Sequence, residues 1–280
     1  MFFGVQLFGI LADWTGDVLD ALKMVKEAGA SSIEPCIAPE EVKEGYEHVV
    51  WPADWLMENA EKIKALGLKI SSAHVFAKNP AVHAEKLTML AEKTGITQYV
   101  LKTPTDLSPE SLQQGALIYM KLADELAPAG ISLLLHNEWT DIDAKIAGKT
   151  AYEHFTDLCL GKVFMQVDAG WVMYAGEDPE AFLMRNAYRV KSLHYKDFTE
   201  TDGKKVQTSP GTGTLDCRAC YRFATAYEVP QLIDQDSFTG DKKEALTAAI
   251  TYLDRLKNTR ERSVSYLNTY NIETGEIKVL

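Results

Sequence analysis

The chain has 280 residues, of which 46% are hydrophobic and 25% are charged, and its formal net charge is −11. This acidic balance argues against a nucleic-acid partner, because phosphate backbones are held mainly by Lys and Arg. No stretch approaches the ~20 apolar residues that cross a bilayer, and residues 1–6 lack the basic start of a signal peptide. We therefore expect a cytoplasmic protein with no membrane partner.

Eight short apolar runs alternate with amphipathic stretches along the chain. They cover residues 3–8, 32–36, 69–75, 98–102, 132–137, 163–168, 190–195 and 231–234. Their spacing matches one strand-plus-helix unit of about 30 residues or more, and their apolar character is typical of parallel strands covered on both faces. This pattern predicts an α/β protein with a single (β/α)8 TIM barrel over residues 1–257. An open doubly wound sheet is the alternative, but no Gly-rich dinucleotide fingerprint follows the first run.

Capping residues mark several of the intervening helices. Ser108-Pro109-Glu110 and Asp178-Pro179-Glu180 each place an N-cap, a proline and an acid at a predicted helix start. Apolar residues at helical spacing predict a further helix over 15–27. Glycines follow four helical runs at the position where helices commonly end, and they are Gly29, Gly67, Gly95 and Gly130.

Two cysteines have the CxxC spacing, Cys217 and Cys220, and they lie on a predicted helix. No second pair completes a zinc site, so we expect two partly buried helix residues, with a redox motif as the alternative. The final stretch, 258–280, is a short C-terminal extension that is polar and lacks a strong period. It could form a hairpin around Thr274-Gly275, pack against the barrel or serve a homo-oligomer interface, and the sequence does not choose among these.

Polar residues gather where the predicted strands end. In this kind of barrel the catalytic groups lie at the carboxyl ends of the strands. The residues at these ends are Glu34, His74, Lys102, His136, Asn137, Glu138, Gln166, Asp168, His194, Lys196, Asp197, Asp234 and Asp236. Burying such groups without partners would cost several kcal/mol each, so a metal with a polyhydroxylated ligand accounts for their convergence.

Four of these residues are candidate metal ligands, and they are His136, Asp168, His194 and Asp234. Mixed imidazole and carboxylate donors suit Mn, Zn, Co, Fe or Ni better than Ca or a bare Mg site, and the sequence does not identify the ion. A divalent cofactor here can act as a Lewis acid on a sugar. The structural alternatives are that Asp168 caps a loop and that His194 is a hydrogen-bonded core residue.

The other strand-end residues are candidates for catalysis and substrate binding. Lys196 could neutralise an oxyanion or form a local pair with Asp197, and His74 could contact substrate. Glu34 and Lys102 could contact substrate or pair across the mouth. Gln166, Trp14 and Trp171 are further candidate substrate contacts, although ordinary loop packing explains the two tryptophans equally well.

The segments that contain these strand-end residues resemble the xylose isomerase-like TIM barrel superfamily. The resemblance is greatest to its sugar phosphate isomerase/epimerase group, which is related to AP endonuclease family 2. The resemblance extends over residues 1–257 in the family's order. Its segments are Ser32-Ile33-Glu34, Ser72-Ala73-His74-Val75, Leu134-Leu135-His136-Asn137-Glu138, Val167-Asp168-Ala169-Gly170, Ser192-Leu193-His194-Tyr195-Lys196-Asp197, Pro210-Gly211-Thr212-Gly213-Thr214-Leu215-Asp216 and Leu232-Ile233-Asp234-Gln235-Asp236. The HxKD segment, preceded by D-x-G and followed by G-x-G-x-x-D, is the most specific.

The resemblance implies a metal between strands five and eight, with Glu, Asp, His and Glu as its usual ligands. Asp168 and His194 match this set. Asp234 is one methylene shorter than the usual Glu, and the strand-five ligand is either His136 or Glu138. In the family's epimerases the two glutamates act as bases on opposite faces of the sugar, so these departures favour simple isomerisation or elimination more than they favour a two-base mechanism.

The leading hypothesis is a metal-dependent isomerase or epimerase that acts on a sugar or keto-polyol through an enediolate. Glu138 (or His136) would remove the proton, Lys196, His74 or the metal would hold the oxygen, and Asp234 would return the proton. The alternatives are a keto-sugar or inositol-type lyase or dehydratase at the same site, and a non-catalytic sugar-binding barrel. A phosphodiesterase is disfavoured, because it would need several more histidines than the six present.

Overall fold

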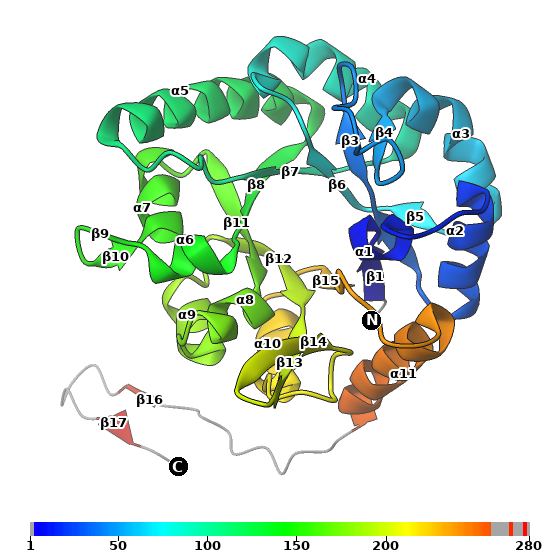
Figure 1. Cartoon of the computed structure of the whole chain (residues 1–280). Coiled ribbons are helices and arrows are strands. Elements are labelled where there is room, and N and C mark those ends of the chain that lie inside the picture. Colours follow the sequence, from blue (N-terminus) through cyan, green and yellow to red (C-terminus); the bar gives the residue numbers. More distant parts are fainter. Residues whose placement is uncertain (1–2, 259–268, 271–276, 279–280) are drawn as a thin grey trace.

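The computed structural model describes residues 3–258, 269–270 and 277–278. Eight parallel strands form the barrel, as predicted, and a ring of helices surrounds them (Figure 1). The barrel closes because the last strand pairs in parallel with both the seventh and the first. The barrel strands are β1 (Phe3–Gln6), β2 and β3 (Ser32–Glu34, Cys36–Ala38), β5 and β6 (Lys69–Ile70, Ser72–Val75), β7 (Gln98–Lys102), β8 (Ser132–His136), β11 (Val163–Asp168), β12 (Val190–Tyr195) and β15 (Gln231–Ile233).

The second and third barrel strands are each divided into two segments. Pro35 separates β2 from β3, since proline has no backbone N–H to give to the sheet. Ser71 separates β5 from β6. The pairing nevertheless continues across both breaks, because Ser71 N donates to Ile33 O and His74 N donates to Pro35 O. An additional short strand, β4 (Val50–Pro52), pairs in parallel with β3.

The helices begin and end largely where their capping residues predict. Ser108 caps α5 and Asp178 caps α9, each accepting a backbone N–H three residues ahead. Asp17 caps α2, so this helix begins at Val18, three residues after the predicted start. The longer helices are α2 (Val18–Glu27), α3 (Ala53–Ala65), α4 (Ala84–Thr94), α5 (Pro109–Leu126), α7 (Ala151–Leu158), α9 (Pro179–Arg185), α10 (Cys217–Ala226) and α11 (Lys242–Arg255).

Short elements complete the described chain. The short helices are α1 (Phe8–Leu11), α6 (Trp139–Asp143), α8 (Ala169–Tyr174), η1 (Pro80–His83), η2 (Ala127–Ala129) and η3 (Leu256–Asn258). The strands outside the barrel pair as β9 (Lys145–Ile146) with β10 (Lys149–Thr150), β13 (Asp197–Thr201) with β14 (Lys204–Thr208), and β16 (Thr269–Tyr270) with β17 (Ile277–Lys278). The sequence patterns did not predict the β13–β14 hairpin. The antiparallel β16–β17 pair agrees with the hairpin alternative for the C-terminal extension, whose turn at Thr274-Gly275 lies outside the described residues.

The apolar core fills the barrel and the layer between strands and helices. Cys217 and Cys220 are part of it, buried on α10 as expected. The four glycines Gly29, Gly67, Gly95 and Gly130 all adopt the positive φ expected at helix ends. None of the helices in the described ranges combines the length and apolar character that a bilayer crossing requires. The fold therefore leaves the carboxyl ends of the barrel strands as the place where buried polar groups concentrate.

Candidate functional site

Four polar residues converge at the carboxyl ends of β8, β11, β12 and β15. We call them the mouth cluster, and they are His136, Asp168, His194 and Asp234. One ligand atom from each lies within 4.8 Å of the others. All four side chains are buried, and Asp168 and His194 are inaccessible to solvent. The structure thus brings together the four residues that the sequence marks as candidate metal ligands.

Strand register explains why these side chains meet. Gln166 lies opposite His136 in the pairing of β11 with β8, and Asp168 lies opposite His194 in the pairing of β11 with β12. Alternate residues of a strand share one face, so Gln166 and Asp168 both point into the barrel interior. Asp234 follows β15 directly, and its backbone N donates to Tyr195 O over 3.0 Å.

The mouth cluster contains polar atoms that the protein leaves unpaired. Asp234 Oδ2 lies 3.1 Å from His194 Nδ1 and 3.6 Å from His136 Nε2. Within the described residues, however, both ring nitrogens of His136, Asp168 Oδ2 and Asp234 Oδ1 have no hydrogen-bond partner. A buried polar atom without a hydrogen bond costs stability. Imidazole with carboxylate is a donor set that divalent ions prefer. The residues present therefore fit a divalent metal ion.

The pKa shifts in the mouth cluster also favour a bound cation. Burial lowers the pKa of His136 to about 3, which leaves its ring neutral. Burial also raises the pKa of Asp168 to about 7, and the charge of Asp234 adds to this effect although Lys196 opposes it. Burial acts against a charged His194, but Glu34 and Asp234 raise the pKa of that ring to about 10. Protons thus occupy positions that a bound cation would take over, since metal ligands must be deprotonated.

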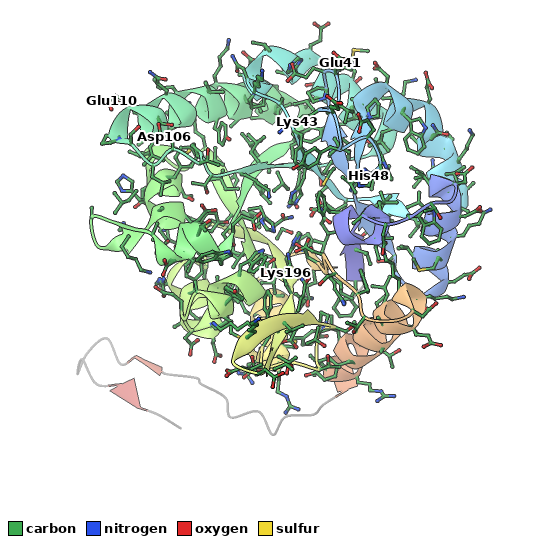
Figure 2. The ribbon with its side chains drawn as sticks, viewed as in Figure 1. Glu41, Lys43, His48, Asp106, Glu110 and Lys196 are labelled. Carbon is green, nitrogen blue, oxygen red and sulfur yellow. The ribbon has the colours of Figure 1, made fainter. Side chains whose placement is uncertain are left out.

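Lys196 places a buried ammonium beside the mouth cluster. Its Nζ lies 2.7 Å from Asp236 Oδ2, 3.1 Å from Asp234 Oδ2 and 3.4 Å from Asp168 Oδ2. It also lies 4.7 Å from the centre of the Trp171 ring, so Trp171 is brought to the site as well. In Figure 2, Lys196 lies inside the ring of helices. Burial opposes its charge, but the three carboxylates hold the pKa of Lys196 well above its usual value.

A second layer of polar side chains lies around the histidines. Glu34 Oε1 is 2.9 Å from the Nε2 atoms of both His74 and His194, although neither ring N–H is aligned with it as a hydrogen bond. Its Oε2 accepts from Gln166 Nε2 over 2.7 Å and from Ser72 Oγ. Glu34 and Gln166 are both inaccessible to solvent. Both side chains are therefore enclosed among the polar groups of the site, and their contact with a substrate stays a prediction.

Glu138 lies at the edge of the mouth and not within the cluster. Its carboxylate pairs with Lys102, and its backbone N donates to Asp141 Oδ2 at the start of α6. Its side chain is 32% exposed. Partial burial acts to raise the pKa of Glu138, but His136 and Lys102 hold it below its usual value. His136 and Glu138, the two alternatives for the strand-five ligand, are thus separated, with His136 among the cluster and Glu138 beside it as a carboxylate.

His74 adjoins the mouth cluster, whereas Trp14 packs in its own loop. His74 is buried, and its ring centre lies 5.0 Å from that of His136. Trp14 is partly buried against the core and its Nε1 donates to Asp17 O, which matches the loop-packing alternative. Asp236 was not a sequence candidate for a role, although the Asp234-Gln235-Asp236 run at a strand end could have marked it.

Comparisons with known proteins agree on the fold. No family model and no curated protein matches the sequence. Among solved structures, a sugar phosphate isomerase/epimerase from Parabacteroides distasonis has 17% identity and a TM-score of 0.71, covering 90% of this chain and 94% of its own. The probable 3-DHS dehydratase AsbF from Bacillus anthracis has 12% identity and a TM-score of 0.67, covering 91% and 99%. A xylose isomerase-like TIM barrel protein from Mycobacterium smegmatis, in complex with magnesium, has 16% identity and a TM-score of 0.66, covering 91% and 96%. The chain has a xylose isomerase-like TIM-barrel fold.

In this xylose isomerase-like barrel, two motif positions have structural explanations. The D-x-G glycine, Gly170, packs so closely that a Cβ atom would lie 2.0 Å from Lys196 O. The HxKD aspartate, Asp197, is fully buried and accepts four backbone N–H groups, from Phe198, Gly211, Gly213 and Leu215. Asp197 therefore holds the G-x-G-x-x-D loop, which explains why the two motifs occur together, and it forms no local pair with Lys196.

Proposed function

We propose that this protein is a metal-dependent isomerase or epimerase that acts on a sugar or keto-polyol through an enediolate. The observation that carries the proposal is the mouth cluster, in which buried imidazole and carboxylate atoms lack hydrogen-bond partners beside a buried ammonium. The similar structures are named as a sugar phosphate isomerase/epimerase, a probable 3-DHS dehydratase and a xylose isomerase-like TIM barrel protein in complex with magnesium, which supports sugar chemistry at a divalent ion.

The mouth cluster would hold the ion through His136, Asp168, His194 and Asp234. When bound, the ion would act as a Lewis acid toward a hydroxy-ketone. Glu34 would act as a positioning residue for His194, because its Oε1 lies 2.9 Å from Nε2 while Nδ1 faces Asp234. A carboxylate behind a ligating histidine fixes the orientation of the ring and raises its basicity. Gln166 and Ser72 would hold Glu34 in place for this task.

The proton transfers would be carried out at the edge of the cluster. Glu138 is a partly exposed carboxylate there, so it would remove the proton from the carbon next to the carbonyl. The Lys196 ammonium would stabilise the negative charge that develops on the enediolate oxygen. Asp234 is enclosed by His194 and Lys196, whereas the side chain of Asp236 is 39% exposed. Asp236 is therefore better placed than Asp234 to return the proton.

The test is hydrogen exchange at carbon. Purified protein loaded with one divalent ion at a time is incubated with a panel of ketoses in heavy water, and exchange is followed by NMR. We expect exchange at the carbon next to the carbonyl, and the matched variant Asp168→Asn should not show it. The absence of exchange with every ion and every ketose of a broad panel would overturn the proposal.

A lyase or dehydratase is the second candidate, and one observation favours it. Asp234 is held by Lys196 and His194, and Asp236 also pairs with Lys196, so in the described part of the chain neither is a free second base of the kind that a two-base epimerase uses. Elimination needs one base and one acid, which Glu138 and Asp236 or Lys196 could supply. Mass spectrometry of the same reactions distinguishes the two functions, because elimination gives a product that has lost water whereas isomerisation conserves mass.

A further inference from the structure

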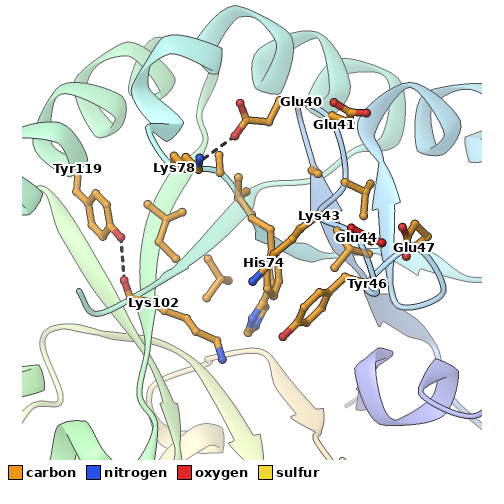
Figure 3. A pocket seen from close by; sticks show the side chains of 18 of the residues that line it. Glu40, Glu41, Lys43, Glu44, Tyr46, Glu47, His74, Lys78, Lys102 and Tyr119 are labelled. Carbon is orange, nitrogen blue, oxygen red and sulfur yellow. Dashed lines mark hydrogen bonds between the residues drawn. The ribbon is translucent and has the colours of Figure 1, made fainter. Parts of the chain in front are cut away.

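A large cavity lies beside the mouth cluster at the carboxyl ends of β3, β6 and β7. It has a volume of about 1010 Å³. The loop over residues 40–47 forms one wall, and the ends of β6 and β7 form the floor (Figure 3). We call it the side cavity. His74 and Lys102 line it and are also neighbours of residues at the site, because the His74 ring lies 5.0 Å from the His136 ring and Lys102 pairs with Glu138.

The side cavity is larger than a single sugar ring requires. Binding sites for drug-sized ligands have volumes of about 300–1,000 Å³, so this cavity lies at the upper limit of that range. A substrate that reacts at the mouth cluster therefore has room to extend beyond its reacting ring.

The chemistry of the wall favours a neutral, polyhydroxylated extension. The apolar part of the floor is formed by Val75, Val100 and Leu101. In Figure 3 the polar ends of Lys43, Tyr46, His74 and Lys102 point toward the interior, while Glu40 and Glu41 lie along the rim. Apolar floor with polar tips is the combination that binds the C–H face and the hydroxyls of a sugar.

The charges of the side cavity do not select an anion. Three lysines line it, but so do four glutamates, and these residues are Lys43, Lys78, Lys102, Glu40, Glu41, Glu44 and Glu47. The lysine nearest the site, Lys102, is already paired with Glu138. A phosphate or carboxylate placed here would meet at least as many negative groups as positive ones, whereas a neutral ring would meet no such cost.

We propose that the side cavity binds a second sugar ring, so that the substrate is a keto-sugar joined through a glycosidic bond to another neutral ring and not a free monosaccharide. This inference rests on the proposed function, since the reacting ring is placed at the mouth cluster.

The test compares three matched substrates in the heavy-water exchange reaction of the metal-loaded protein. They are a keto-sugar, the same keto-sugar bearing a neutral glycosyl group, and the same keto-sugar bearing a phosphate at that position. We expect kcat/KM for the glycosylated compound to exceed that of the other two by about tenfold or more, mainly through a lower KM. Equal values for the free and glycosylated sugars, or a larger gain with phosphate, would overturn the inference while the proposed function stands. No exchange with any of the three would remove both.

A cavity-filling variant tests whether the gain in kcat/KM from the second ring arises in the side cavity. Ala77 lines the side cavity, and Ala77→Phe should reduce the ratio of kcat/KM between the glycosylated and free sugars to near one. The matched control is Ala129→Phe, which places the same side chain at an exposed position of η2, on the chain just before the amino end of β8, and should leave the ratio unchanged. Thermal unfolding of both variants verifies that they fold. A ratio that Ala77→Phe leaves at the wild-type value would show that the second ring binds elsewhere.

Discussion

Two groups of buried charges in this protein differ in how completely they are paired. The mouth cluster contains ring nitrogens and carboxylate oxygens without hydrogen-bond partners. The second group lies outside the barrel between α7 and α9, and we call it the flank network, made of Thr150, Glu153, Arg185 and Asn186. Glu153 there accepts hydrogen bonds from Thr150, Arg185 and Asn186, and within the described residues none of its oxygens lacks a partner.

The difference separates a functional role from a structural one. A fully paired buried charge leaves no polar atom unsatisfied, so that removing one partner is costly, whereas an incompletely paired one costs stability and is retained where chemistry needs it. Burial acts to raise the pKa of Glu153, yet Arg185, Asn186 and Thr150 lower it to about 2. In the mouth cluster burial dominates, and the pKa of Asp168 rises to about 7. The charged carboxylate form is thus stabilised in the flank network and destabilised in the mouth cluster.

The largest expected effect comes from neutralising the mouth cluster. Asp168→Asn should reduce carbon-bound hydrogen exchange by about 10³-fold, because it removes a charged ligand from the metal. The free energy of unfolding of the metal-free variant should be equal to or above that of wild type, since the change relieves a poorly paired buried charge. Exchange rates, metal analysis and chemical denaturation measure these quantities. A metal-free variant that is several kcal/mol less stable would place Asp168 with the structural charges.

Glu138→Gln should reduce exchange by about 10²-fold, the contribution of one general base, while the bound metal stays stoichiometric. The reason is that Glu138 lies beside the cluster and pairs with Lys102, whereas His136 lies within it. Metal analysis of Glu138→Gln and His136→Ala, carried out side by side, checks the assignment. Loss of metal from Glu138→Gln and its retention in His136→Ala would reverse the two roles.

Removing the metal should lower the free energy of unfolding only in proteins whose mouth cluster is intact. An ion present at 100 times its dissociation constant should raise the free energy of unfolding by about 2.7 kcal/mol over the chelated protein. The Glu153→Gln variant should show the same increment, because the flank network is remote from the ligands, and Asp168→Asn should show almost none. Thermal or denaturant unfolding with and without chelator measures all three, and equal increments in all of them would mean that the ion binds elsewhere.

Glu153→Gln should lower the free energy of unfolding by about 2 kcal/mol at neutral pH, because it removes charge-assisted hydrogen bonds from a buried network. Exchange activity per folded molecule should stay at the wild-type level. Denaturant unfolding gives the first quantity and the exchange assay the second. A variant with unchanged stability would show that the paired charge contributes nothing to the fold.

The smallest expected effect is the pH dependence of the difference in free energy of unfolding between wild type and Glu153→Gln, and it is also the most specific test. The folded pKa of Glu153, about 2, lies below its usual value of 4.5, so the unfolded state binds more protons between these values. The stability that Glu153 provides is therefore complete above pH 4.5 and is lost as the pH falls toward 2. The difference between wild type and Glu153→Gln should shrink over this window, and a constant difference would contradict the assigned pairing.

Much of the fold and the grouping of the four candidate metal ligands could be predicted from the sequence, because both depend on local pattern. The run 163–168 is β11 residue for residue, and its last residue joins the mouth cluster as expected. Depth within the barrel could not be predicted, since a strand pattern gives the face of a side chain but not its distance from solvent. Glu34 therefore appeared as a residue of the open mouth, and its side chain is fully buried. The choice between His136 and Glu138 likewise depended on where β8 ends.

The four N–H groups that converge on Asp197 have a practical consequence for protein engineering. They fix the start of β13 and the loop after β14, whereas the turn at Asp202 and Gly203 between the two strands is exposed and carries positive φ at both residues. Exposed turns of this kind tolerate added residues better than any other part of a fold. A peptide tag or a fluorescent reporter could therefore be inserted there, and it would leave the loop that Asp197 anchors undisturbed.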